Sequence, residues 1–220
     1  MSQSQYPRVI TWILQLLHRR TQKPSIRKMN GLLVQICPQV FNPITGRTTQ
    51  FFIQHMQIKP ENRVLEIGTG SGAIAAAAAS CAQSVTATDV NPYAVQCAQT
   101  TMRLNDLEKK VRVLLGDLFA PVDGERFDVV LFNPPYLAFQ PRSWLAQAWS
   151  AGPNFELLEK FLDGVREVLK DEGKIQILLS SATVLSEIFK LIRNAAFGIR
   201  VIAEGRMLGF MERIYLLQLS

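Results

Sequence analysis

From residue 63 onward, short and almost wholly apolar runs alternate with longer segments whose apolar residues recur at helical spacing. Short apolar runs are typical of parallel strands buried on both faces, and the segments between them are typical of crossover helices. We expect strands at 63–67, 84–88, 111–115, 127–132 and 174–179, and helices at 73–80, 93–105, 154–170 and 182–196. This alternation predicts an α/β fold with a doubly wound, mostly parallel sheet.

Two more apolar runs, at 199–203 and 213–219, have no helical segment between them. The connection is too short for a crossover of a dozen or more residues, so the two strands must pair antiparallel as a hairpin. The complete sheet then has seven strands and resembles a Rossmann sheet closed by an antiparallel strand. Residues 60–220 form one predicted domain, and residues 1–59 form a helical or extended segment that packs on it.

Basic residues are concentrated at the front of the chain. The first 60 residues hold eight Lys or Arg and no Asp or Glu, whereas the remainder holds 16 basic and 18 acidic residues. The net charge of +6 is therefore +8 in front and −2 in the rest. A surface for RNA or another acidic partner, if the chain has one, is expected in the front segment.

The apolar run at 9–17 has helical spacing, with Ile10, Ile13, Leu14 and Leu17 on one face. It predicts either a helix packed on the domain or a basic amphipathic helix that contacts an acidic membrane surface or RNA. The run is far shorter than the roughly 20 residues of a transmembrane helix. It is followed by basic residues instead of a small-residue cleavage site, so a cytoplasmic protein is expected and an organelle transit peptide is the lesser alternative.

The three cysteines, Cys37, Cys81 and Cys97, show neither the spacing of a metal site nor that of a disulfide framework. We therefore expect free thiols in a reducing compartment, with Cys81 and Cys97 in the core. His18 and His55 are isolated in the sequence, and no metal site is predicted.

A glycine-rich turn lies between the first predicted strand and its helix. Glycines there permit positive φ angles and let a ligand approach the backbone, which favours Gly68, Gly70 and Gly72 as cofactor-binding residues. Asp89 ends the next strand, 21 positions after Gly68, where a carboxylate can accept hydrogen bonds from both hydroxyls of a ribose. A nucleoside-type cofactor is predicted, and the alternative is a turn that serves only tight packing.

The turn alone does not identify the cofactor, because Gly68-x-Gly70-x-x-Ala73 also fits a dinucleotide fingerprint. Glu66, inside the preceding strand, favours a cationic ligand with an α-amino group and a sulfonium over a pyrophosphate. S-adenosyl-L-methionine is therefore the expected cofactor. An NAD(P)-dependent oxidoreductase is the remote alternative, and a cofactor-binding scaffold without catalysis is a further one.

Asp117 and Leu118 follow the third strand. The Asp117 carboxylate can accept a hydrogen bond from an adenine amino group while Leu118, or Phe119 beside it, packs on the ring. The alternative for Asp117 is a cap on the next turn of a surface loop.

The fourth strand runs directly into Asn133-Pro134-Pro135-Tyr136. Ligands of open α/β sheets bind at this edge, and two prolines fix the direction of the Pro134 carbonyl. An amide or arylamine nitrogen is a poor nucleophile because its lone pair is delocalised. If Asn133 and the Pro134 carbonyl each accept one N–H, they hold the NH2 group and aim that lone pair, while Tyr136 stacks on the planar substrate. An ordinary loop is the alternative for the isolated tetrapeptide.

Together, Val64-Leu65-Glu66-Ile67-Gly68-Thr69-Gly70-Ser71-Gly72 and Phe132-Asn133-Pro134-Pro135-Tyr136 resemble the HemK-type branch of the class I methyltransferases. The resemblance covers about Pro60 to Ser220, and Trp149-Ser150-Ala151-Gly152-Pro153 is similar to the family's Trp-x-Gly-Gly stretch. It implies N-methylation of a glutamine side chain in a protein such as a translation release factor.

The sequence departs from the family in three places. Ala151 replaces a glycine, the stretch 41–48 keeps a proline but lacks an acid, and the long helical N-terminal domain of the bacterial enzymes is missing. The shorter chain is similar to a compact branch, which implies a small activating subunit. The same tetrapeptide occurs in enzymes that methylate the exocyclic amine of adenine or guanine in RNA or DNA, and this remains the main alternative because residues 1–60 are basic.

Overall fold

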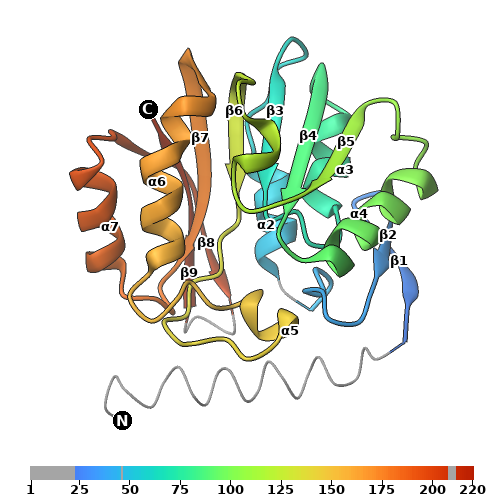
Figure 1. Cartoon of the computed structure of the whole chain (residues 1–220), viewed down its shortest axis with the longest axis horizontal. Helices are drawn as coiled ribbons and strands as arrows, with labels where there is room; N and C mark the ends of the chain where they lie inside the picture. Colours follow the sequence, from blue (N-terminus) through green and yellow to red (C-terminus); the bar gives the residue numbers. More distant parts are fainter. Residues whose placement is uncertain (1–22, 46, 208–211) are drawn as a thin grey trace.

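The computed structural model describes residues 23–45, 47–207 and 212–220, and its centre is a seven-stranded sheet (Figure 1). The strands run in the order β5-β4-β3-β6-β7-β9-β8, parallel from β5 to β7 and antiparallel at β9 and β8. The predicted α/β class and the mostly parallel sheet are confirmed. The strands are β3 (Arg63–Ile67), β4 (Ser84–Asp89), β5 (Val111–Leu115), β6 (Phe127–Phe132), β7 (Leu169–Ser180), β8 (Ile199–Met207) and β9 (Glu212–Leu219).

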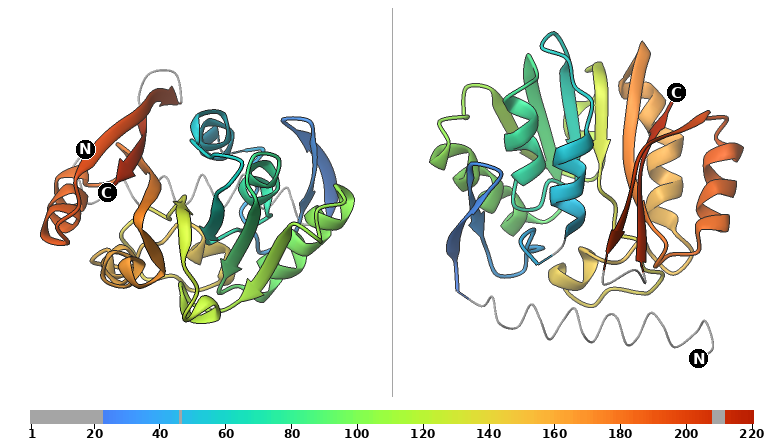
Figure 2. Two further views of the ribbon diagram at one scale, coloured as in Figure 1. Left: turned by 90° about the horizontal axis from the view of Figure 1, so that it is seen from above. Right: turned by 180° about the vertical axis from the view of Figure 1, so that it is seen from behind.

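Helices cover both faces of the sheet, which makes three layers (Figure 2). One face carries α2 (Arg47–His55), α3 (Ala73–Ala79) and α4 (Pro92–Leu104), and the other carries α6 (Glu156–Val168) and α7 (Leu185–Asn194). A short helix, α5 (Trp144–Gln147), and a 3-10 turn, η1 (Ala120–Val122), lie in the connections. Among the described residues, no helix is long and apolar enough to cross a membrane.

Alternation along the central strands divides the core in two. In β3, Val64 faces the cluster beneath α3, whereas Leu65 and Ile67 face the cluster beneath α6. In β6, Val129 and Leu131 face the first cluster, and Val130 and Phe132 face the second. Successive side chains of a strand point to opposite faces, so each apolar run contributes to both cores.

The predicted C-terminal hairpin is confirmed, with β8 and β9 paired antiparallel. β9 inserts between β7 and β8, so the later strand of the hairpin pairs with the parallel part of the sheet. The hairpin strands are longer than expected, because pairing extends to Met207 on β8 and begins at Glu212 on β9.

The boundary between the sixth helix and β7 differs from the prediction. The helix was expected to run from Asn154 to Lys170, but α6 spans Glu156–Val168 and β7 begins at Leu169. Phe155 precedes the helix with a φ of 63°, and the Asn154 side chain bonds Glu156 instead of capping the helix. The segment 171–173, between the expected helix and the expected strand, belongs to β7, because pairing with β6 begins as early as Leu169.

The front of the described chain forms a hairpin of β1 (Ser25–Met29) and β2 (Leu32–Ile36), which lies against α4 (Figure 2). α2 follows and buries Phe52 completely in the cluster beneath α3. The helix expected at 9–17 lies outside the described residues, and the domain boundary at residue 60 stays a prediction.

The expectation for the cysteines was wrong in two respects. Cys37 and Cys97 form a disulfide with a Cα–Cα distance of 6.1 Å, and Cys81 is exposed instead of packed in the core. The sequence separation of 60 between the bonded cysteines explains the first error, since only the fold brings the segment after β2 beside α4. Cys97 is buried, as expected.

Gly72 packs against α4 so closely that a methyl group would not fit. A Cβ there would lie 2.8 Å from Met102 Cε and 3.0 Å from the Cα of Ala98, and the Gly72 φ is +80°. Gly70 also has a positive φ, of +55°, but a Cβ on it would meet nothing within 4 Å. At Gly70, only the backbone conformation favours glycine. At Gly72, the backbone conformation and the close packing against α4 both favour it.

We expect Gly72→Ala to lower the free energy of unfolding by about 2–4 kcal/mol, because it adds a clash to an unfavourable φ. Gly70→Ala is the matched control and should cost only about 1–2 kcal/mol. Denaturant unfolding of both variants measures the difference, and equal losses would contradict the packing role of Gly72.

Candidate functional site

The predicted site residues meet at the carboxyl ends of four neighbouring strands, β5, β4, β3 and β6. Ile67 pairs with Thr88 of β4 on one side and with Phe132 of β6 on the other. The residues that follow these strands therefore lie side by side, and they line one pocket. Its lining includes the predicted residues Glu66, Gly68, Gly70, Asp89, Asp117, Leu118, Asn133, Pro134, Pro135 and Tyr136.

The glycine turn adopts the backbone shape that its sequence predicts. Gly68 has a φ of +69°, and the backbone N–H groups of Gly68 and Thr69 both donate to the Thr88 carbonyl, at 2.9 and 3.0 Å. Gly72 is not among the lining residues, since it faces α4. Gly72 is required for close packing against α4, whereas Gly68 and Gly70 leave the backbone open to a ligand.

Asp89 is tied to the turn and to the start of α4. One carboxylate oxygen accepts from the Gly70 N–H at 2.8 Å and the other from the Asn91 N–H at 2.9 Å. Burial raises its pKa, and these backbone hydrogen bonds oppose the rise. Each carboxylate oxygen has a second lone pair, so Asp89 retains acceptors for a pair of ribose hydroxyls.

Glu66 is a buried acid at the base of the pocket, with 2% of its surface exposed. Burial raises its pKa to about 8, and the nearby Asp89 adds to the rise. A hydrogen bond from the Thr69 hydroxyl, 2.7 Å long, opposes it. Without a cation in the pocket, Glu66 is mostly protonated at neutral pH, and an adjacent positive charge would favour its ionised form.

Leu118 also lines the pocket, with Asp117 beside it. Its φ is 45°, an unusual value for a residue with a side chain, and the Thr88 hydroxyl donates to its carbonyl at 3.0 Å. This bond connects the loop after β5 to the end of β4. An apolar surface and a carboxylate are thus placed together, as an adenine ring and its amino group require.

The Asn-Pro-Pro-Tyr turn leaves its acceptors available. Within residues 23–45, 47–207 and 212–220, neither the Asn133 side chain nor the Pro134 carbonyl accepts a hydrogen bond. Pro134 is buried, whereas Asn133 and Tyr136 are half-buried in the pocket lining. Burial and the nearby Glu212 carboxylate raise the pKa of Tyr136, so its phenol stays neutral.

A second wall of the pocket was not predicted as part of the site. Val40, Phe41 and Pro43 line it from the segment that joins β2 to α2, and Thr48 and Thr49 line it from the first turn of α2. Trp144, Gln147 and Ala148 line it from α5 and the residue after it. Neither of these two parts of the wall follows a strand of the seven-stranded sheet. Pro43 is the one sequence feature that could have indicated the part between β2 and α2.

The loop that carries α5 is fixed next to the Asn-Pro-Pro-Tyr turn. Leu137 forms a parallel bridge to Ser150, and its N–H donates to the Trp149 carbonyl at 2.9 Å. The Ala151 N–H donates to the Leu137 carbonyl at 3.0 Å. The stretch 149–153 is therefore held against the turn, although neither segment is regular secondary structure.

This set of groups fits S-adenosylmethionine. Glu66 suits its cationic end, Asp89 its ribose, and Leu118 with Asp117 its adenine, while the positive-φ glycines leave the backbone open between them. Asn133 and Pro134 then lie on the side of the pocket left for an acceptor substrate. Among the described residues, no group of His, Cys, Asp or Glu has the arrangement of a metal site.

Comparison with known proteins places the pattern in a family. The family model described as "Methyltransferase small domain" matches residues 42–204. A protein of Methanocaldococcus jannaschii named "Putative protein N5-glutamine methyltransferase" is 32% identical over 184 residues, which are 81% of this chain and 91% of that protein.

Other relatives are longer than the part that matches. A release factor glutamine methyltransferase of Rhodopirellula baltica is 30% identical over 177 residues, and the match covers 73% of this chain but 58% of that enzyme. Among solved structures, the Mtq2–Trm112 complex of E. cuniculi, described as responsible for methylation of the eRF1 termination factor, gives a TM-score of 0.62. At 21% identity it covers 83% of this chain and 98% of the matched chain, and it shares the fold.

The raised pKa of Glu66 predicts proton release when the expected cofactor binds. Its cationic end should lower this pKa, so binding at pH 7 should release up to one proton. In the ligand-free protein, burial favours the neutral form of Glu66. The free energy of unfolding should therefore fall as pH rises from about 4.5 to about 8. Calorimetric titration in two buffers of different ionisation enthalpy measures the released proton.

Glu66→Gln is the matched control, since the amide can still accept from Thr69 but cannot ionise. It should bind the cofactor more weakly and release no proton. A wild-type protein that releases none at pH 7 would contradict the proposed contact.

Proposed function

This chain belongs to the methyltransferase small domain family, in its HemK-type branch, and on that premise we propose that it methylates a glutamine side-chain amide of a protein, with S-adenosyl-L-methionine as cofactor. One observation carries the proposal. The Asn133 side chain and the Pro134 carbonyl, both without hydrogen-bond partners among the described residues, lie in the same pocket as Glu66 and Asp89.

The chemistry requires little more than positioning. The bound cofactor supplies a methyl group on a sulfonium, which is already an activated leaving group. Asn133 Oδ1 and the Pro134 carbonyl can each accept one N–H of a carboxamide, which holds the NH2 group and orients the nitrogen lone pair towards the cofactor side. The neutral Tyr136 ring can cover the planar amide. The methylated nitrogen becomes strongly acidic and loses one N–H proton to water, so no general base of high pKa is needed.

Glutamine in a translation protein is the substrate that the relatives support. The Rhodopirellula relative is named for release factors, and another, from Bradyrhizobium diazoefficiens, is named for ribosomal protein uL3. The pocket's second wall, with Phe41 and Trp144, suits a single flat side chain inserted from a protein loop. We propose a translation release factor as the substrate and the cytoplasm as the compartment.

A small activating subunit is also proposed. It is supported by the neighbour from E. cuniculi, which was solved as a complex with Trm112 and whose chain is covered almost fully by this one. The wider family resemblance includes longer chains, and this chain spans little more than half of the Rhodopirellula enzyme.

Asn133→Ala should abolish methyl transfer without loss of cofactor affinity. It removes an acceptor that holds the substrate NH2 group, so the expected fall in kcat is about 10²–10³-fold. The dissociation constant of S-adenosylhomocysteine should stay within about twofold of wild type, because the cofactor is held by Glu66, Asp89 and the glycine turn. Equal losses in both measurements would remove Asn133 from the substrate site.

The charge of the first 60 residues supports one alternative, an N-methyltransferase of an adenine or guanine amine in RNA or DNA. Labelled methyl donor, offered with release factors and with RNA in separate reactions, distinguishes the two. We expect label in protein, at a site lost on Gln→Glu substitution of the acceptor. Label in RNA, with affinity that falls steeply as salt rises, would favour the alternative.

A further inference from the structure

The hairpin strand β2 and the segment after it are joined to α4 at four successive points, which we call the strand–helix ladder. Leu33 exchanges two hydrogen bonds with the Asn105 side chain, of 3.0 and 2.8 Å. The Gln35 N–H donates to Thr101 Oγ1 at 3.1 Å. The third point is the Cys37–Cys97 disulfide, and at the fourth the Asn91 side chain donates to the Gln39 carbonyl at 2.9 Å.

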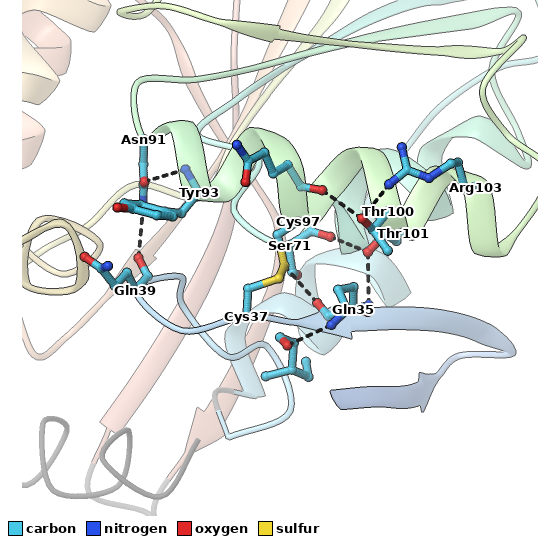
Figure 3. The surroundings of a disulfide bond; sticks show 12 residues. Gln35, Cys37, Gln39, Ser71, Asn91, Tyr93, Cys97, Thr100, Thr101 and Arg103 are labelled. Carbon is cyan, nitrogen blue, oxygen red and sulfur yellow. Dashed lines mark hydrogen bonds between the residues drawn. A yellow bond between two sulfur atoms is a disulfide. The ribbon is translucent and has the colours of Figure 1, made fainter. Parts of the chain in front are cut away.

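The ladder follows from two periodicities. Residues 33 and 35 are alternate positions of β2, and 105, 101 and 97 are four positions apart along α4 and its C-cap; after Ile36 the chain turns, and Gln39 has a φ of +62°. Two residues of a strand advance about 6.6 Å and four residues of a helix about 6 Å, so the two elements stay in step. Figure 3 shows Gln35, Cys37 and Gln39 facing this helix in turn.

The second and fourth points of the ladder are bonded to segments that line the cofactor pocket. Thr101 also donates, at 2.7 Å, to the carbonyl of Ser71 in the glycine turn (Figure 3). Asn91, which anchors Gln39, is itself bonded through its backbone N–H to Asp89. Immediately after Gln39, the chain forms the pocket wall at Val40, Phe41 and Pro43.

Near the disulfide, the wall is held by apolar packing and by the aromatic contact of Phe41 with Trp149, whose ring centroids lie 6.4 Å apart. Val40, Ala94 and Cys97 form a small buried cluster of their own, with Cys37 packed against it. This cluster is separate from the two large cores of the sheet. The disulfide therefore adds a covalent link between the segment 37–43 and α4 to the Asn91–Gln39 hydrogen bond and this packing.

The two sulfur atoms are placed to react in turn. Cys37 is half-buried and can be reached from solvent, whereas Cys97 is 1% exposed. Cys97 Sγ lies 3.2 Å from the Gln35 carbonyl, a contact that becomes a hydrogen bond when the sulfur carries a proton. The reduced pair therefore also has a satisfied arrangement in the same fold.

We propose that Cys37 and Cys97 form a reversible thiol-oxidation site that sets how tightly the segment 37–43 closes the cofactor pocket. On oxidation, the two thiols lose two protons and two electrons and form one S–S bond. A low-molecular-weight disulfide, such as oxidised glutathione, accepts the two protons and the two electrons and is split into two thiols. A dithiol reverses the exchange through attack on Cys37, and its own two sulfurs then form a disulfide.

The inference rests on the proposed cofactor site, and binding of S-adenosylhomocysteine to the full chain tests it. The protein is oxidised with oxidised glutathione or reduced with dithiothreitol, and alkylation followed by mass spectrometry counts the free thiols. We expect one reactive thiol, Cys81, in the oxidised form and all three cysteines in the reduced form. The dissociation constant should be about fivefold higher or more after reduction.

Cys37→Ser should bind like the reduced protein under both conditions, whereas the matched control Cys81→Ser should respond like wild type because Cys81 is exposed and lies outside the ladder. Hydrogen exchange gives a second readout that needs no cofactor, since backbone amides of 37–43 should exchange faster after reduction. Equal affinity and equal exchange in the two verified redox states would overturn the proposal, as would failure of the folded protein to form the bond.

The outcomes also separate the two proposals. A redox effect on binding, without methyl transfer to any protein, would contradict the proposed substrate and leave the thiol site standing. Absence of binding in both states would overturn the cofactor site and the thiol-oxidation site together.

Discussion

The in-register alignment of β4, β3 and β6 is the constraint on which the site depends. The chain leaves β3 towards β4 and β5, and then returns to place β6 on the other side of β3. At this reversal the connections leave the sheet in opposite directions and open a crevice at the carboxyl ends. Because Thr88, Ile67 and Phe132 end at one level, the residues that follow each strand meet there, although Gly68 and Asn133 are far apart in sequence.

The same alignment explains how two acids are tolerated in a buried place. Glu66 lies one residue before the end of β3, and Asp89 is the last residue of β4, so both are at the rim of the core and not in its middle. Local groups partly satisfy them: the Thr69 hydroxyl for Glu66, and the backbone N–H groups of Gly70 and Asn91 for Asp89. The remaining desolvation cost of the two carboxylates is unfavourable without a cation, and a positively charged ligand relieves it.

The part of the structure that the sequence predicts is the part that local physics determines. Short, almost wholly apolar runs identified β3 to β6, and the short connection between the last two runs required the hairpin of β8 and β9. The β1–β2 hairpin, the early start of β7 and the disulfide depend on contacts between distant segments, such as Gln35 with Thr101. For the site, the strand ends were predicted as one pocket, whereas the wall from Val40 to Thr49 and α5 was not, because neither follows a strand of the sheet.

This division bears on how specificity arises within the fold. The groups that suit the cofactor come from motifs whose geometry is set by the sheet, so any chain with this register can build them. The groups that border the acceptor side, including Phe41 and Trp144, come from segments fixed by individual bonds: Asn91 to Gln39, Cys37 to Cys97, and Leu137 to Trp149 and Ala151. Such bonds can change without disturbing the sheet. Under the proposed function, substrate choice and its control would belong to these added walls, and cofactor binding to the strand ends.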